Sequence, residues 1–417
     1  MRVLIVTQYF WPEDFRINDL ARGLRERGHE VTVYTGKPNY PGGRFFPGYG
    51  FFGQGNESYD GIRVNRVPLI ARGNSSGFRL ALNYASFAII ASLLAPFRAR
   101  GDFDVILVYE PSPVTVGIPA LVLKALKGAP LLFWVQDLWP ETLVATDAVR
   151  ASWILKCVDR LVRFIYRGCE RILVQSVTFV ESIQRFGIAR ERILYFPNSA
   201  EGLYQPITLK PDAPERTQIP EGFKVMFAGN VGAAQDFETI LGAAERLRNE
   251  TAIQWIILGE GRLLSWVESE VKERGLERSI HLLGRHPVES MPRFFALANA
   301  MLVTLRRDPI LAMTIPARVQ SYLACARPIV AALDGEGARI IDEAGAGVAA
   351  RSGDPDGLAR AVMEIYLMPE TERQQMGERG RRYFEQHFER EMLLTRLEGW
   401  MQELTQTRES SIVNRES

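Results

Sequence analysis

The sequence predicts an α/β protein of two doubly wound, Rossmann-like halves that face each other across a central cleft. Short apolar runs alternate with stretches of helical periodicity, as in a parallel sheet covered by helices. The alternation stops over residues 201–222, where Pro and polar residues take its place. We therefore divide the chain into an N-terminal domain (1–200), a linker (201–222), a C-terminal domain (223–385), a C-terminal helix (386–407) and a disordered tail (408–417).

Composition narrows the possible classes of function. The chain has 417 residues, of which 47% are hydrophobic, enough for the cores of two or three domains. Its net charge of +1, without a nucleic-acid-binding motif, does not favour a nucleic-acid partner. The cysteines Cys157, Cys169 and Cys325 are scattered, and the four histidines form no metal-binding spacing. The apolar run Val3–Val6 is too short for a signal peptide, so we expect a cytoplasmic protein.

The N-terminal half begins with a βαβ unit. Val3–Thr7 and Val31–Thr35 are predicted strands, and the helix between them ends at Gly28. A long loop follows over Lys37–Ser58, rich in Gly, Pro and aromatic residues. Loops of this length inside compact domains are usually functional or mobile, so the loop is either an acceptor-facing element or a disordered flap.

One stretch, Leu80–Phe97, raises the question of membrane contact. It is apolar and flanked by Arg79 and Arg98, and it approaches the roughly 20 residues that a bilayer span needs. Asn83 and Pro96 interrupt it. We expect a buried helix of the first domain, with a membrane-surface helix as the alternative and a true span least favoured.

The remaining strands continue the alternation in both halves. They are predicted at Asp104–Tyr109, Pro130–Val135, Arg171–Gln175, Ile193–Phe196, Val225–Ala228, Gln254–Leu258, Ile280–Leu283, Ala300–Leu305 and Ile329–Leu333. A last long helix, charged and amphipathic, is predicted from about Glu370 to Gln406.

The strongest predicted binding site lies between two strands of the second half. Ala300–Leu305, a loop, a helix and Ile329–Leu333 form a crossover unit of a parallel sheet. Such units place the loop and the helix N-terminus at the carboxyl edge of the sheet, where open α/β sheets bind ligands. Thr314, Arg318 and Ser321 are therefore candidate binding residues.

Three glycine-containing turns follow strands of the same half. They are Gly229–Gly232 (GNVG), Gly259–Arg262 (GEGR) and Gly284–Arg285. Bare amides at a helix N-terminus hold phosphates, so three such turns at one sheet edge beside Arg318 favour a nucleotide diphosphate. Leu264 stands where a dinucleotide fingerprint needs its third glycine, which argues against a nicotinamide cofactor.

The first half offers candidate acceptor-side residues. Asp137 follows a predicted buried strand and Glu141 lies four residues later, so a carboxylate here could position or deprotonate an acceptor hydroxyl. A helix N-cap is the alternative for Asp137. Glu13 and Arg16, after the first strand, suggest either a clamp for an anionic substrate or an ordinary capped helix start.

The chain resembles the retaining glycosyltransferases of family four, the group-one transferases with a GT-B arrangement. The resemblance spans nearly the whole chain, through the segments QYFWPEDFRINDLARGLRERGHEVTVYTG, WVQDLWPE, FAGNVGAAQDFETILGAAERL, LGEGR, LLGRHPVESMP and IPARVQSYLACARPIVA. The segments PNYPGG, GNVGAAQD and IPARVQSYLA are most similar to the WbuB-type branch, which is linked to O-antigen and capsule assembly and to N-acetyl-L-fucosamine transfer.

The resemblance implies a UDP-sugar donor site in the second half and an acceptor site in the first, without a metal or other cofactor. The catalytic residues would be Asp137, Glu141 and Arg318, with Arg318 as the phosphate clamp. The donor-binding residues would be Gly229, Asn230, Gly232, Gln235, Gly261, Arg262, Arg285, Thr314 and Ser321. Glu13 and Arg16 would lie on the acceptor side.

The chain departs from the family pattern at several positions. Met313 and Ser321 stand where members commonly have two glutamates, and Asn230 and Gln235 where many have Arg and Lys. Ala326 replaces a usual glycine. A Ser hydroxyl is neutral and shorter than a glutamate, so the expected hydrogen-bond acceptor for ribose is missing.

These observations predict a glycosyltransferase that moves a sugar from a UDP-sugar to a polyprenyl-linked or saccharide acceptor with retention. It would act in O-antigen or capsule synthesis, in the cytoplasm and in peripheral contact with the inner face of the cell membrane. Two alternatives remain. One is a nonhydrolysing UDP-sugar 2-epimerase, and the other is a catalytically silent nucleotide-sugar-binding partner.

Overall fold

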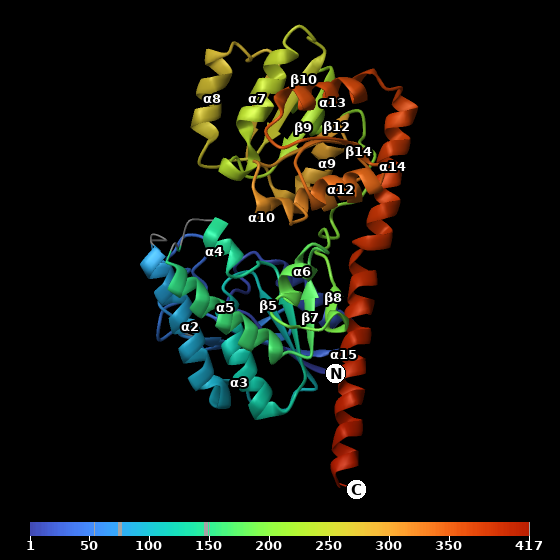
Figure 1. Ribbon diagram of the computed structural model, residues 1–417. Helices are drawn as coiled ribbons and strands as arrows, with labels where there is room; N and C mark the ends of the chain where they lie inside the picture. The colour runs from blue at the N-terminus through green and yellow to red at the C-terminus, as the bar shows by residue number, and fades with distance from the viewer. Residues whose placement is uncertain (54, 74–76, 146–148, 150, 417) are drawn as a thin grey trace. The chain divides into compact units, whose positions relative to one another are not determined.

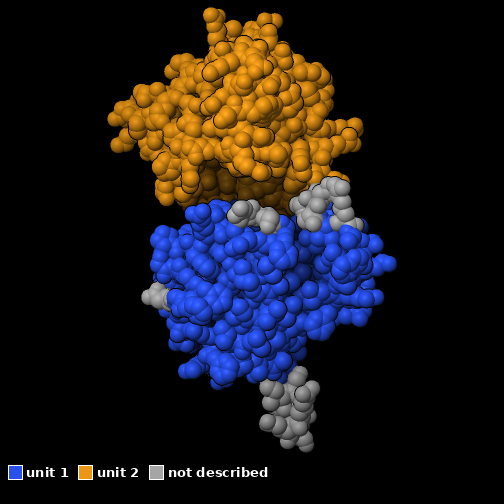
Figure 2. All heavy atoms as spheres, turned by 90° about the vertical axis from the view of Figure 1, so that its left-hand side faces the viewer, with its two compact units in different colours: residues 1–197, 393–417 blue, residues 198–392 orange. Residues whose placement is uncertain are grey.

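The computed structural model describes the whole chain except residues 54, 74–76, 146–148, 150 and 417. The chain divides into two compact units, coloured separately in Figure 2. Unit 1 contains Met1–Pro197 and Leu393–Ser417, and unit 2 contains Asn198–Met392. The main division therefore falls at Pro197, just before the predicted linker.

Unit 1 is built on an eight-stranded sheet in the order β3-β4-β2-β1-β5-β6-β7-β8, parallel except for β3. Its strands are β1 (Arg2–Val6), β2 (Glu30–Gly36), β3 (Asn56–Tyr59), β4 (Ile62–Val67), β5 (Val105–Glu110), β6 (Leu131–Val135), β7 (Arg171–Val174) and β8 (Ile193–Tyr195). Its helices are α1 (Arg16–Glu26), α2 (Gly77–Arg98), α3 (Gly117–Lys127), α4 (Glu141–Ala145), α5 (Ser152–Arg167), α6 (Phe179–Gln184) and α15 (Arg390–Glu416). Every residue of β5 and β6 is buried, as expected when helices cover both faces of a parallel sheet.

The helices of unit 1 divide between the two faces of the sheet. The connections through α2, α3 and α5 run toward the β8 end of the sheet. The connection from β1 to β2 through α1 runs toward the β3 end. Because such crossovers are right-handed, α1 lies on one face and α2, α3 and α5 lie on the other. Figure 1 shows these three helices on one side of the sheet, and α3 contacts both of the others.

Unit 2 is built on a six-stranded parallel sheet in the order β11-β10-β9-β12-β13-β14. Its strands are β9 (Phe223–Ala228), β10 (Ile253–Leu258), β11 (Ile280–Gly284), β12 (Ala300–Thr304), β13 (Ile329–Ala332) and β14 (Gly347–Ala350). Its helices are α7 (Phe237–Arg246), α8 (Leu264–Glu273), α9 (Met291–Phe295), α10 (Pro309–Ala312), α11 (Ala317–Ala324), α12 (Glu336–Glu343), α13 (Pro355–Leu367) and α14 (Glu370–His387). One buried cluster includes Phe295, Val319 and Ile340, and a second includes Phe237, Trp255 and Val362.

The prediction of two doubly wound α/β domains is confirmed, and each predicted strand is present. Three strands were not predicted: β3, β4 and β14. β3 begins inside the segment predicted as a long loop, because Asn56–Tyr59 (NESY) is polar and only half-buried and so lacks an apolar signal.

The C-terminal region differs from the prediction of one helix followed by a disordered tail. α14 ends at His387, and α15 begins at Arg390 after the carboxylate of Glu389 accepts hydrogen bonds from the backbone N–H groups of Glu391 (2.9 Å) and Met392 (2.6 Å). α15 then continues to Glu416, through the residues predicted as a tail. Arg408 ties it to unit 1 by donating to the carbonyl oxygens of Phe103 and Lys127 at 3.2 Å.

The prediction of a buried helix at Leu80–Phe97 holds for one face of α2 only. Asn83 is buried and hydrogen-bonds to Gln8 (2.7 Å) and to the carbonyl oxygen of Ile70 (2.6 Å), which fixes the helix to the domain. Only 28% of the most apolar part of the helix is buried. Within the described residues, α2 is the one helix long and apolar enough to cross a membrane by composition alone.

Candidate functional site

The glycine turns of unit 2 pack against one another at the carboxyl edge of the sheet. The N–H of Gly229 donates to the carbonyl oxygen of Leu258 (2.9 Å), and the N–H of Gly259 donates to that of Gly284 (2.7 Å). A Cβ on Gly259 would lie 1.8 Å from the Gly229 oxygen, and a Cβ on Gly261 would lie 2.2 Å from the Val231 oxygen. No side chain fits at Gly259 or Gly261, and the hydrogen bonds join the three turns into one surface at this edge.

Arg318 lies beside this surface, in the first turn of α11. Its guanidinium stands 4.6 Å from the ring centroid of Phe227, and its Cδ would be 3.4 Å from a Cβ on Gly229. Its Nη1 is buried and has no hydrogen-bond partner in the part of the chain that the structure describes. Burial lowers the pKa of the guanidinium, yet arginine remains charged in proteins. A cation with a buried, unpaired nitrogen beside the glycine turns is the arrangement that an anionic ligand would complete.

Other predicted donor residues lie around the same edge. Gln235 belongs to a short 3-10 turn whose backbone accepts hydrogen bonds from Thr304 and Arg306, which fixes the segment after Asn230 against the end of β12. The side chains of Asn230, Arg262 and Arg285 are exposed. Their predicted contacts with phosphate and base therefore remain predictions.

The hydroxyls proposed for ribose and sugar binding donate to backbone carbonyl oxygens three or four residues earlier in the chain. Ser321 is 7% exposed and donates to the carbonyl oxygen of Ala317 (3.2 Å), and Thr314 donates to that of Leu311 (3.0 Å). Met313, the other residue at a family glutamate position, is half-buried at the end of α10. Each hydroxyl oxygen can still accept a hydrogen bond, so their role as ligand contacts remains a prediction.

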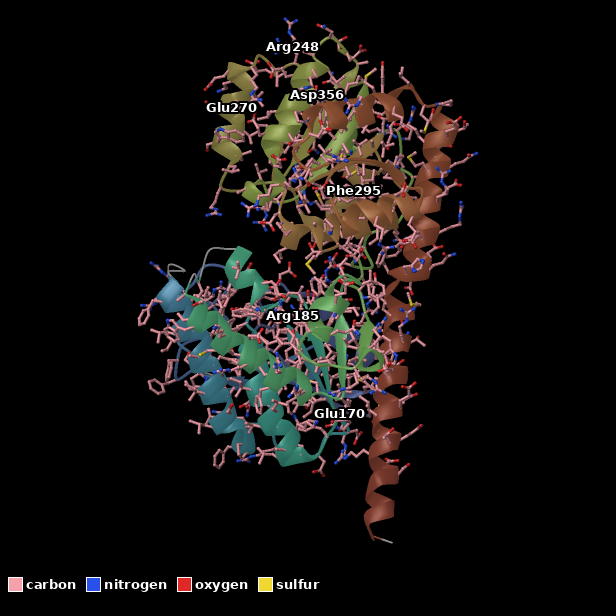
Figure 3. All side chains as sticks on the ribbon, viewed as in Figure 1. Glu170, Arg185, Arg248, Glu270, Phe295 and Asp356 are labelled. Atoms are coloured by element: carbon pink, nitrogen blue, oxygen red, sulfur yellow. The ribbon has the colours of Figure 1, made fainter. Side chains whose placement is uncertain are left out.

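Sequence reasoning missed three residues at this edge. Asp308 caps α10 by accepting from the N–H groups of Ile310 and Leu311. Glu336 is 2% exposed at the start of α12 and pairs with Arg339 at 2.8 Å. Tyr322 holds the end of β9 through its hydroxyl, 3.1 Å from the N–H of Ala228, and stacks edge-on against Phe295, which Figure 3 labels. Asp308 and Glu336 each follow a strand, and Tyr322 lies within α11. These positions were the signals in the sequence that could have identified them.

In unit 1, two carboxyl groups meet at the carboxyl edge of the sheet. Glu110 ends β5 and is fully buried, while Asp137 follows β6 and is half-buried. Burial and then the charge of Asp137 raise the pKa of Glu110 well above its usual value. Burial also raises the pKa of Asp137 to about 6, against a hydrogen bond from Ser112 that lowers it. Ser112 in turn accepts from the indole N–H of Trp139 at 3.0 Å.

A cluster of aromatic rings and an arginine includes Tyr84, which lies within electrostatic range of Asp137 and Glu110. Arg72 donates to the hydroxyl of Tyr9 (3.0 Å) and lies 5.0 Å from the ring of Tyr40. Tyr84 stands edge-on to Trp139, with the ring centroids 6.3 Å apart. Aromatic faces beside a cation and a carboxyl group suit a sugar that carries an anionic group. The sequence indicated the aromatic-rich loop that contains Tyr40, but isolated residues such as Tyr84 on α2 gave no signal for this cluster.

Glu13 and Glu141 both bond to other groups within unit 1. Glu13 is 1% exposed, and its carboxylate accepts from the N–H groups of Asn39 and Tyr40, each at 2.7 Å. It therefore joins two loops rather than meeting a substrate, and burial raises its pKa to about 7. Glu141 begins α4 and pairs at 2.9 Å with Arg185, labelled in Figure 3. That ion pair engages one oxygen of Glu141, and its predicted catalytic role remains a prediction.

Arg16 lies at the start of α1, and its predicted role on the acceptor side remains a prediction. It is half-buried in the first turn of α1, and its positive charge acts on Tyr109. Within the described part of the chain, no group of three or more His, Cys, Asp or Glu side chains could hold a metal ion.

A cavity of about 550 Å³ lies elsewhere in unit 2, at the amino edge of the sheet. It is lined by Arg327, Arg373 and Arg381 among others. Arg373 donates to carbonyl oxygens at the end of α13, and Arg381 donates to that of Ala324 (2.7 Å). These arginines therefore serve helix ends, and the cavity is separate from the glycine turns.

Two α/β domains, each built on a largely parallel sheet, are typical of the GT-B class of glycosyltransferases. In this chain the second domain carries the glycine turns and Arg318. The structure is similar to that of Anabaena Alr3699/HepE in complex with UDP, with a TM-score of 0.68 and 12% identity over 97% of this chain and 100% of that chain. It is also similar to sucrose-phosphate synthase from Thermosynechococcus elongatus, with a TM-score of 0.70 and 16% identity over 97% and 99%. At these identities the likeness shows the fold.

Two family models match the chain. A glycosyl transferase 4-like domain matches residues 15–199, and the glycosyl transferases group 1 model matches residues 222–367. The probable glycosyltransferase WbjE of Pseudomonas aeruginosa is 29% identical over 73% of this chain and 74% of its own length. The putative colanic acid biosynthesis glycosyl transferase WcaI of Escherichia coli K12 is 24% identical over 78% and 81%. The chain belongs to the group 1 glycosyltransferases and is a transferase enzyme.

Proposed function

We propose that this enzyme transfers an N-acetylated sugar, N-acetyl-L-fucosamine or a close relative, from a UDP-sugar to a lipid-linked or saccharide acceptor in surface polysaccharide synthesis. The observation that carries the donor half of the proposal is the buried, unpaired Nη1 of Arg318 beside the glycine turns. The complex of HepE with UDP supports uridine as the nucleotide, and the description of WcaI supports a polysaccharide product. The resemblance to the WbuB-type branch supports the sugar.

The chemistry follows from the charge that develops during transfer. As the bond between sugar and diphosphate breaks, negative charge grows on the leaving diphosphate, and Arg318 with the backbone amides of the turns would stabilise it. Asp137 would orient the acceptor hydroxyl and receive its proton, since a pKa of about 6 leaves it ionised at neutral pH. We propose retention of the anomeric configuration, no metal requirement, and action at the cytoplasmic face of the cell membrane.

Nucleotide binding tests the donor site directly. Thermal shifts are measured with UDP, GDP, dTDP and UDP-N-acetyl sugars on the wild type, Arg318→Ala and Arg278→Ala, whose exposed arginine in the same unit is the control. We expect uridine ligands to raise the melting temperature of the wild type and of Arg278→Ala but not of Arg318→Ala. No shift of the wild type with any nucleotide would remove the donor proposal.

A silent nucleotide-sugar-binding partner is the second candidate. The hydroxyl of Ser321 bonds within its helix, and Met313 carries no charge, so neither supplies the carboxylate common in the family. Release of UDP in the presence of a lipid-linked acceptor, with the sugar appearing on that acceptor, would exclude the silent partner. The family match favours transfer over the epimerase, which would convert donor without acceptor.

A further inference from the structure

The outer surface formed by α2, α3 and α5 is unusually apolar for a domain surface. Eight of the seventeen large apolar side chains that are exposed in the described chain lie on these three helices. They are Phe78, Leu82, Ile89, Leu93 and Phe97 on α2, Leu126 on α3, and Trp153 and Phe164 on α5, each between 37% and 77% exposed. Figure 2 looks onto this side of unit 1. Large exposed apolar patches mark interaction sites.

The apolar residues of α2 form a continuous outward stripe. They recur at helical spacing, and the segment from Leu80 to Phe97 contains no charged residue. The opposite side of the helix carries Asn83, Phe87 and Ala91, which are buried against the sheet. The hydroxyl of Tyr34 also donates to the carbonyl oxygen of Ala91 at 2.6 Å. α2 is thus fixed in the domain, and its outer side is available to a partner.

α5 adds positive charge to the same surface. Lys156, Arg160, Arg163 and Arg167 are exposed and recur at helical spacing, so they lie along one side of the helix, next to the exposed Trp153 and Phe164. The one acidic residue of α5, Asp159, pairs with Arg163 at 3.7 Å. An apolar stripe beside a basic and aromatic stripe matches the acyl and headgroup layers of an anionic bilayer.

We propose that the outer surface of α2, α3 and α5 docks on an anionic phospholipid bilayer, with the apolar side chains of α2 inserted at the interface and the basic residues of α5 on the headgroups. Two copies of the chain would bring their basic stripes together, so charge disfavours self-association through this surface. The inference rests on the proposed function only in that a lipid-linked acceptor lies in such a bilayer. Docking itself is measured without turnover.

Cys157 provides a reporter within the surface. It is exposed, whereas Cys169 and Cys325 are buried, so a thiol-reactive environment-sensitive dye labels it selectively. We expect the dye emission to shift to shorter wavelength with vesicles of phosphatidylglycerol and phosphatidylethanolamine, and much less with phosphatidylcholine alone. Added salt should weaken the response, because part of the attraction is electrostatic.

Sedimentation of the unlabelled full-length protein with the same vesicles separates the two contributions. We expect Ile89→Ser with Leu93→Ser to weaken binding about tenfold or more, because two large apolar side chains no longer insert. Lys156→Glu with Arg160→Glu should weaken binding to a similar extent, on anionic vesicles only. The matched controls in unit 2 are Leu367→Ser, at a side chain 72% exposed, and Arg278→Glu, and both should bind as the wild type does.

Three results would overturn the proposal. They are a wild type that does not bind vesicles, binding that the surface variants leave unchanged, and a dimer in light scattering without vesicles that Ile89→Ser with Leu93→Ser dissociates. In the last case a second copy covers the surface. The UDP thermal shift and transfer to a soluble saccharide acceptor are measured on the same variants. If a variant loses vesicle binding but keeps the UDP thermal shift and the transfer activity, the proposed function stands without the docking proposal. If it keeps vesicle binding but loses the UDP shift and transfer, the docking proposal stands without the proposed function.

Discussion

Asp137 combines burial with a position at the carboxyl edge of the sheet in unit 1. Its pKa rises from 3.8 to about 6 in the folded protein. The folded state therefore binds the proton more tightly than the unfolded state, and the free energy of unfolding falls as the pH rises from about 4 to about 6. Above that window the folded protein carries the full cost of a desolvated carboxylate.

The first prediction is that Asp137→Asn stabilises the protein at pH values above this window. A shift of about two units corresponds to roughly 3 kcal/mol, so the unfolding free energy at pH ~7.5 should rise by about 1–3 kcal/mol. The gain should shrink towards pH ~4, where both states are protonated. Urea unfolding at several pH values measures this, with exposed Asp212→Asn as the control. A gain that does not depend on pH would contradict the burial argument.

The same substitution should lower transfer activity. An amide cannot accept the proton of an acceptor hydroxyl, so we expect kcat to fall by about 10²–10⁴-fold while the thermal shift with UDP is unchanged. The wild-type rate should decline as the pH falls below about 6. Full activity in the variant would assign Asp137 a structural role.

Gly259 is a glycine of the donor edge at which the neighbouring backbone leaves no room for a side chain. Its φ of 153° and the 1.8 Å distance from a Cβ to the Gly229 oxygen predict that Gly259→Ala destabilises unit 2 by about 2–4 kcal/mol. The variant should also weaken UDP binding, since the two turns must separate. Gly202→Ala, where a Cβ would meet nothing within 4 Å, is the control for both measurements.

Much of the donor edge could be predicted because its signals are local. A glycine turn after an apolar run is visible in the sequence, and Gly229, Gly259 and Arg318 do come together. Glu13 and Glu141 show the limit of such signals, because a carboxylate after a strand has the same local sequence whether it contacts a ligand, the N–H of Asn39 or the guanidinium of Arg185. The partners are distant in sequence, so only the folded chain distinguishes these cases.

At the scale of elements, α15 is the helix that packs onto unit 1 from the far end of the chain. Leu397 and Met401 are fully buried, and Trp400 packs edge-on against Phe196 with ring centroids 5.9 Å apart. Glu398 bonds to Arg27 and His29 near the end of α1. The tail 408–417 was predicted as disordered because its polar composition gives no sign that α15 continues and that Arg408 bonds to Phe103 and Lys127.

We predict that Leu397→Ala lowers the free energy of unfolding of unit 1 by about 2–5 kcal/mol, the usual cost of a core cavity. Glu403→Ala, on the exposed side of the same helix, should change it by less than about 0.5 kcal/mol. Urea unfolding followed by tryptophan fluorescence measures both. Equal small effects would show that α15 contributes little to the core.

At the scale of the molecule, the two units have separate cores and separate sheets. Ligand binding at unit 2 should therefore stabilise that unit without repairing damage to unit 1. Leu107→Ala, in the buried strand β5, should lower the calorimetric transition of unit 1 while UDP still raises the transition of unit 2. Loss of the UDP response in this variant would contradict the separation.

The division of unit 1 between the two ends of the chain has a consequence for synthesis. A ribosome completes the sequence of unit 2, Asn198–Met392, before the residues of α15 that cover unit 1 exist. Domains generally fold as units while the chain emerges. The nascent first domain therefore exposes Phe196 and the end of α1 until translation is nearly over, and the domain that begins first is the one that finishes last.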